Sequence, residues 1–234
     1  MRRIGLCVLV VVIVGAVSGN AQEHAYSLSA GGSFATSSKL FHHATDPDEF
    51  IRSQFQPLDD IFGATIDVRR TIEAIGIQIG LSIEYLSKTE TFNAPITTAR
   101  PVSSVDGFTA LPIELSGYFD IPVGDETIRL YMGGGGGIYL GNRRYAIANV
   151  DAPTVGRNVQ LGIHVLSGAE YTLSPGFALR SELKFRNVQF ETTNKFQQAT
   201  AQYQGRFISL PQEPIVSRIN IDGMMLTLGL AYRF

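Results

Sequence analysis

Glycines at positions 133–137 form an unbroken run, and this is the stretch of the sequence in which ligand chemistry would first be sought. Glycine-rich loops can wrap backbone N–H groups around a phosphate, but a P-loop continues with Lys and then Ser or Thr. Here Ile138, Tyr139 and Leu140 follow, and they continue a strand-like pattern. Residues without side chains also make room for bulky groups opposite them or let a strand bend. We therefore predict relief of crowding and no nucleotide site.

A second candidate is a metal site in a polar segment near the N-terminal side. Its members would be His42, His43, Asp46, Asp48 and Glu49. Their spacing matches no defined metal-binding pattern, and a solvated loop explains them. The single cysteine, Cys7, lies in an apolar N-terminal stretch and offers neither a disulfide framework nor a cysteine metal site. We expect no metal and no cofactor.

The first residues have the composition of a secretory signal. Arg2 and Arg3 supply positive charge, an apolar stretch too short to be a typical membrane helix follows, and residues 18–21 are small enough for cleavage. We predict a signal peptide over residues 1–21 and one outer-membrane β-barrel domain over residues 22–234. The mature chain would keep 17 of the 19 basic residues against 21 acidic ones, a net charge near −4 that does not suggest nucleic acid binding.

The elements that carry the polar residues alternate with a period of two. After residue 21 no run of 18 apolar residues occurs, so helical membrane spans are not expected. Charged residues make up only 17% of the chain, fewer than in a usual soluble domain. Period-two alternation is typical of strands with two different faces. The predicted strands are 25–35, 62–71, 75–87, 107–121, 127–141, 157–173, 177–191 and 220–234.

The connections between these segments differ in length in a regular way. Short turns, such as 174–176, alternate with long polar segments, among which 36–61 and 192–219 are the longest. Transmembrane barrels have short periplasmic turns and longer extracellular loops, and a bilayer requires every strand edge to be paired. We predict an all-β fold: an eight-stranded antiparallel up-and-down transmembrane β-barrel.

At this point the sequence resembles the small outer-membrane barrels of the OmpA and OmpX kind, over essentially the whole mature chain. Residues 226–234 alternate and end on an aromatic residue, and residues 170–182 resemble a hairpin of that family. The resemblance implies the outer membrane of a Gram-negative bacterium, surrounding outer-membrane lipid, and help from periplasmic chaperones and the barrel-assembly machinery. It also implies that Tyr232 and Phe234 belong to the assembly signal. No peptidoglycan-binding domain follows the last strand, so a cell-wall tether is not implied.

If the apolar strand faces meet lipid, the other faces line the barrel. A β-bulge would reverse this assignment beyond it. The lumen of an eight-stranded barrel is only wide enough for side chains, and charges buried there must be paired. Six acids against five bases favour a closed, salt-bridged interior over an open pore. The predicted charge network is Asp67, Arg69, Glu84, Glu114, Asp120, Arg129, Glu170, Arg180, Glu182, Lys184 and Arg186.

His164 and the aromatic residues complete the predicted pattern. His164 has the chemistry of a general base, but it falls on the inward face of segment 157–173 and is expected to belong to the polar interior. Tyr118 and Tyr139 also point inward. Tyrosines on the outward faces near strand ends could form interfacial girdles. They are Tyr26, Tyr85, Tyr171 and Tyr232.

These features lead to a non-catalytic membrane protein with a structural or surface-interaction role. A surface ligand would bind at the long loops 36–61 and 192–219, where several aromatic residues are expected to be exposed. They are Phe41, Phe50, Phe55, Phe196, Tyr203 and Phe207. The alternative is a small channel for ions or small solutes. A lipid-modifying enzyme lacks a convincing nucleophile and base, and a soluble ligand carrier would need the opposite polarity of the two strand faces.

Overall fold

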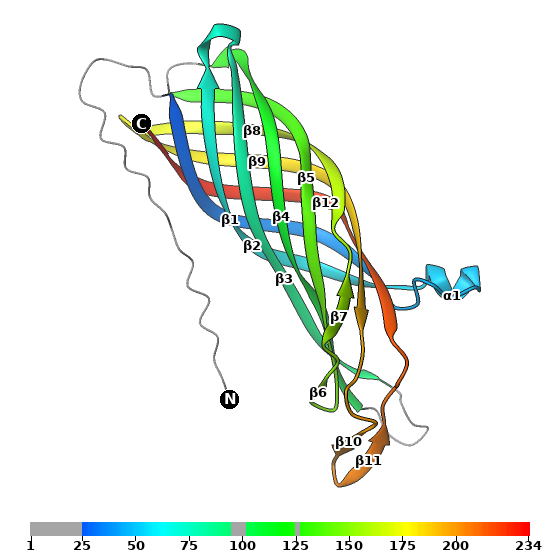
Figure 1. Cartoon of the computed structure of the whole chain (residues 1–234). Helices are drawn as coiled ribbons and strands as arrows, with labels where there is room; N and C mark the ends of the chain where they lie inside the picture. Colours follow the sequence, from blue (N-terminus) through cyan, green and yellow to red (C-terminus); the bar gives the residue numbers. More distant parts are fainter. Residues whose placement is uncertain (1–24, 95–101, 125–126) are drawn as a thin grey trace.

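A computed structural model describes residues 25–94, 102–124 and 127–234 of the protein. Long strands pair antiparallel in chain order, and the last one pairs with both its predecessor and the first, so the sheet closes on itself (Figure 1). The predicted eight-stranded antiparallel barrel is confirmed. The strands of the barrel wall are β1 (Tyr26–Phe41), β2 (Phe55–Ile72), β3 (Ile77–Ala94), β4 (Val102–Gly124), β5 (Ile128–Ile147), β8 (Gln160–Ser174), β9 (Phe177–Asn194) and β12 (Ile215–Arg233). The predicted signal peptide lies outside the described residues.

One end of the barrel, called the turn end here, carries short connections. A short 3-10 helix, η1 (Glu73–Ile75), joins β2 to β3 and ends at Gly76, whose φ of 64° is left-handed. Gly176, with φ of 83°, makes the tight turn between β8 and β9. Such backbone angles carry little steric penalty only in glycine, so these two glycines determine where the turns form. The C-terminus lies at this end, where the backbones of Phe234 and Tyr26 exchange hydrogen bonds of 2.9 and 3.0 Å.

The opposite end, called the loop end, carries the other secondary structure elements (Figure 1). They are α1 (Glu49–Ser53), β6 (Val150–Asp151), β7 (Thr154–Arg157), β10 (Thr200–Tyr203) and β11 (Arg206–Ser209). The long segments between the predicted strands at this end are 36–61, 88–106, 142–156 and 192–219. Their interpretation as loops was wrong in extent, because the wall strands continue into them. No helix within the described residues has the length and apolar character needed to cross a bilayer.

Two irregularities reverse the strand faces near mid-barrel. In β1, Ala35 is buried inside, and beyond the register shift that follows it Ser38 and Leu40 are the buried residues. In β2, Leu58 and Ile61 are both buried at a spacing of three. Between them Asp60 takes a left-handed φ of 55°. A bulge re-aims side chains in this way without breaking the sheet.

The polarity of the two wall faces is inverted between the ends of the barrel. Strand β12 shows this clearly. Toward the turn end its outward side chains are apolar, with Leu228 55% exposed, whereas toward the loop end Asn220 and Asp222 face outward. The inward face changes in the opposite sense, and Ile219 and Ile221 are buried there. Near the loop end the barrel is thus organised like a water-soluble barrel.

The inverted half has a continuous apolar core inside the barrel, named the inner apolar cluster. Its members are Ala35, Leu40, Leu58, Ile61, Leu86, Phe108, Ala110, Phe190, Ile219, Ile221 and Met225. The apolar outward band of the other half runs over 177–185 of β9 and 224–233 of β12, which is the strand length that a bilayer requires. Tyr85 and Phe62 are exposed at the edge of this band nearer the loop end, and Tyr26, Tyr171 and Tyr232 at the edge nearer the turn end. Only half of the wall therefore has a surface suited to lipid.

Candidate functional site

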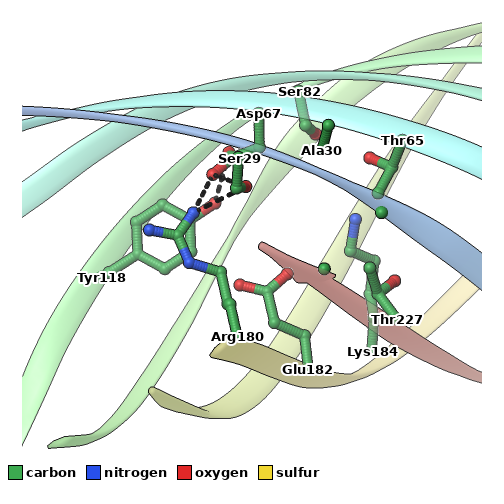
Figure 2. A pocket seen from close by; sticks show the side chains of 12 residues that line it. Ser29, Ala30, Thr65, Asp67, Ser82, Tyr118, Arg180, Glu182, Lys184 and Thr227 are labelled. Carbon is green, nitrogen blue, oxygen red and sulfur yellow. Dashed lines mark hydrogen bonds and ion pairs between the residues drawn. The ribbon is translucent and has the colours of Figure 1, made fainter. Parts of the chain in front are cut away.

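Oppositely charged side chains cross the barrel in the half nearer the turn end. Asp67 accepts from Arg69 Nε at 2.7 Å and from Arg180 Nη1 at 2.6 Å, and Arg69 also pairs with Glu182. The Arg69 guanidinium lies 3.8 Å from the ring centroid of Tyr118. Figure 2 shows Asp67, Arg180 and Glu182 turned toward the same interior space. Strands distant in sequence are thereby joined across the lumen.

A second group of charges lies nearer mid-barrel, around Glu114. This carboxylate is 1% exposed and pairs with Lys184, with Arg186 at 3.4 Å, and with the hydroxyl of Tyr139, which donates to it at 2.5 Å. Arg186 also pairs with Glu84 at 2.7 Å. Each buried charge therefore has an opposite charge within reach, as burial requires.

The third group lies at the turn end, where Glu170 is fully buried. It pairs with Arg180 at 2.7 Å, with Arg129 at 3.0 Å and with Arg233. Asp120 is 3.6 Å from Arg129, and its side chain is 47% exposed, against 29% for Arg129. The structure places these last two residues at the mouth of the barrel, where the strand leaves the packed interior. They are not part of the buried interior that the alternation of β4 and β5 indicated.

Side chains fill most of the lumen in the half nearer the turn end. The cavity between Ser29, Asp67, Tyr118, Arg180 and Lys184 has a volume of about 20 Å³. This is room for one or two water molecules. Toward the loop end the inner apolar cluster follows directly. In the described structure a solute would have to displace both layers to pass.

No protein family model matches the sequence, and no curated protein matches it either. Among solved structures, the outer membrane protein OprG from Pseudomonas aeruginosa is similar with a TM-score of 0.57 at 11% identity, over 91% of this chain and 97% of that one. Outer membrane protein AlkL, determined in lipid bilayers, is similar with a TM-score of 0.52 at 15% identity, over 94% of each chain. The chain has the fold of the small outer-membrane β-barrels. At these identities the likeness concerns the fold alone.

Within this outer-membrane barrel fold, His164 takes part in an arrangement that has the residue types of a catalytic triad. Its Nε2 is 2.8 Å from the Ser116 hydroxyl, and its Nδ1 is 3.8 Å from Glu114. A nucleophile and base need an orienting hydrogen bond and a place for substrate. Here the Nδ1 distance is too long for a hydrogen bond, and Glu114 is held by Lys184 and Tyr139. The three side chains are buried in the filled lumen, which suits a structural role.

A further buried ion pair lies near the loop end, and sequence reasoning missed it. Arg143 binds Asp106 through two nitrogens and donates to Ser217 at 2.5 Å, and all three side chains are buried. His42 Nδ1 accepts from Arg143 Nη2 at 2.9 Å. Asp106 and Arg143 lie in segments interpreted as loops, for which no inward or outward face is assigned from the sequence. Extending the period-two alternation of 107–121 and 127–141 into those segments would have found them.

His42 makes the attachment of the segment 42–54 sensitive to pH. Arginine can only donate, so His42 Nδ1 must be unprotonated to accept its hydrogen bond. Burial and the Arg143 guanidinium lower the pKa of His42 below its ordinary 6.5, against the opposing effect of Asp106. The neutral form is favoured in the folded state, so this contribution to stability is complete above pH 6.5. It is lost as the pH falls from there through the folded pKa.

We therefore expect hydrogen exchange of residues 42–54, corrected for intrinsic rates, to be faster at pH 5 than at pH 7.5. His42→Gln keeps a neutral acceptor that cannot be protonated in this range, and its protection should not change between the two pH values. His43→Gln, next in sequence, is the matched control and should retain the pH effect. Equal protection of wild type at both pH values would show that His42 does not hold this segment.

A second apolar cluster, named the cap cluster, closes the loop end. Its members are Val102, Ile147, Ala148, Ala152, Phe196, Ala201, Ile208 and Leu210. The expectation that Phe196 is exposed is wrong, since it is 1% exposed and its ring lies 5.7 Å from that of Tyr145. Phe50 and Phe207 are exposed, at 74% and 78%. The last long loop is thus a folded cap with its own core.

The proposed assembly signal lies on the outer wall at the turn end. Tyr232 and Phe234 are 46% and 49% exposed, and their rings stack at 5.8 Å. Tyr26 stacks on Phe234 at 6.0 Å. An aromatic surface here suits the membrane interface. Recognition of these two residues by the assembly machinery stays a prediction.

Proposed function

We propose that the protein is a non-catalytic barrel of the Gram-negative outer membrane, with the turn end in the periplasm and the loop end outside. A signal peptide would direct its export, and chaperones and the barrel-assembly machinery would insert it. Its lumen is closed, and its activity is a structural or interaction role at the cell surface. A surface partner would bind the loop end, around α1 and the cap.

The filled interior is the observation that carries this proposal. A conducting pore needs a continuous water path, whereas here paired charges occupy the half nearer the turn end and the inner apolar cluster the half nearer the loop end. The same two layers leave no space for a substrate at His164. The ordered, polar-surfaced extension beyond the lipid-facing band supports a role outside the membrane.

Conductance in planar bilayers tests the closed lumen against the alternative of a small channel. We expect refolded wild type to be silent. A variant that combines Arg180→Gln, Lys184→Gln, Arg186→Gln and Phe190→Ala should leak, because it hydrates the charged half of the lumen and opens the apolar half; its conductance counts only for barrels shown to be folded by heat-modifiable electrophoretic mobility. A matched variant neutralising the outward cations Lys39, Arg144 and Lys195 should stay silent. Steady channels in wild type would support the alternative and contradict the closed lumen.

A competition experiment in the native bacterium tests the surface role. Segment 195–214 would be replaced by a short Gly-Ser connection, with folding checked by heat-modifiable electrophoretic mobility. We expect this strain to lose as much fitness as one lacking the protein, under conditions in which the protein matters. If the shortened barrel competes like wild type, the cap is not the functional part and the barrel itself must be.

A further inference from the structure

A hollow opens in the loop end between the turn that carries β6 and the segment before β10. Its volume is about 400 Å³, which lies in the range of small-molecule sites. We call it the cap hollow. It is lined by Asn149, Val150, Asp151, Pro153, Gln197 and Gln198.

The backbone around the cap hollow is firmly held. The Asn194 side-chain amide donates to the Ala152 carbonyl at 2.8 Å, and the Ala152 N–H donates to the Tyr145 carbonyl at 2.8 Å. Lys195 N–H donates to the Pro153 carbonyl at 3.2 Å and so joins the two sides. The cap cluster lies beneath, with Phe196 packed into it directly before the lining glutamines. The backbone walls of the hollow are therefore preformed, which lowers the entropic cost of binding.

The polar groups that line the cap hollow are free to bind a ligand. Within the described part of the chain, the side chains of Asn149, Asp151, Gln197 and Gln198 have no hydrogen-bond or ion-pair partner. Amides both donate and accept hydrogen bonds, and a carboxylate accepts them with two oxygens. Val150 and Pro153 add an apolar surface, and the lining includes no cation.

We propose that the cap hollow binds a neutral, hydroxyl-rich ligand, namely a sugar residue of a surface oligosaccharide. Adjacent hydroxyls can donate to the two oxygens of Asp151, while the amides of Gln197 and Gln198 exchange hydrogen bonds with others. An anionic ligand would be repelled by Asp151, and an apolar one would leave four polar side chains without partners. This inference rests on the proposed placement of the loop end outside the cell.

Binding of the folded, full-length mature barrel in nanodiscs to a printed array of neutral, sialylated and sulfated glycans tests the inference. We expect binding to neutral glycans. Asp151→Ala and Gln197→Ala should each weaken it at least about tenfold, because each removes hydrogen bonds made inside the hollow. Gln202→Ala, an exposed glutamine on β10 outside the hollow, is the matched control and should bind like wild type.

Three results would overturn the inference: no glycan bound, preference for sialylated or sulfated glycans, or neutral-glycan binding that survives both hollow substitutions in barrels shown to be folded. If the cap hollow binds a peptide and not a sugar, no glycan will bind, which is the first of these results. The competition experiment separates the two proposals. A fitness loss on replacing 195–214, without any glycan binding, would retain the surface role and reject the sugar ligand.

Discussion

Replacing Glu114 with glutamine is expected to destabilise the folded barrel by about 3–5 kcal/mol, the cost of leaving a buried charge without its partner. The substitution keeps the volume of the side chain and removes only its charge. Lys184, which is 6% exposed, pairs with Glu114 and would keep its charge in the lumen. Arg186 would retain Glu84 at 2.7 Å. Urea unfolding in lipid vesicles measures the loss. It is followed by far-ultraviolet circular dichroism, because the chain has no tryptophan for fluorescence.

Two variants separate the effect of charge from other effects at this site. Adding Lys184→Met to Glu114→Gln removes both members of the pair and should recover most of the stability, since an apolar replacement of a buried pair is often neutral. Glu90→Gln removes a partner of Lys88 from a more exposed pair at 3.2 Å and should cost no more than about 1 kcal/mol. A loss at Glu114 as small as that at Glu90 would mean that water screens the lumen.

Replacing Phe190 with alanine is expected to cost about 3–5 kcal/mol, through lost burial and the cavity that remains. Phe190 is fully buried, and its ring lies 6.2 Å from that of Phe108 in an edge-on arrangement. It also covers Gly141 so closely that a Cβ there would be 2.0 Å from the ring. Neighbouring strands cannot collapse easily into the space, because the closed wall holds them apart. The same unfolding measurement applies.

The matched control for this loss is Phe207→Ala on β11. Phe207 is 78% exposed, so its removal should change stability by no more than about 0.5 kcal/mol. Phe190→Leu should give an intermediate loss, because part of the volume remains. Equal effects at Phe190 and Phe207 would contradict the existence of a packed apolar core in the half of the barrel near the loop end.

The alternation of the sequence was sufficient to predict the fold and the inward charges at the level of the apolar band. In β9, Arg180, Glu182, Lys184 and Arg186 alternate with apolar residues, and all four are buried inside. Alternation is enough to assign the inward face there. A strand turns successive side chains to opposite faces, and contact with lipid requires apolar residues on one of them. The short turns were equally readable, since Gly176 is needed for its left-handed backbone.

Only the tertiary structure decided where the strands end and which charges meet. Beyond the apolar band water covers the outside, so the polar face turns outward and the apolar face inward, and a strand such as 186–194 has the composition of a loop. The bulge after Ala35 then exchanges the inward and outward faces of β1, and no residue in the local sequence indicates this bulge. Asp106 and Arg143 meet through the β4–β5 pairing and the folding of 42–54 over them. Sequence periodicity shows which residues share a face of a strand. Whether that face points inward or outward depends on the medium outside the wall, which changes from lipid to water along the barrel axis.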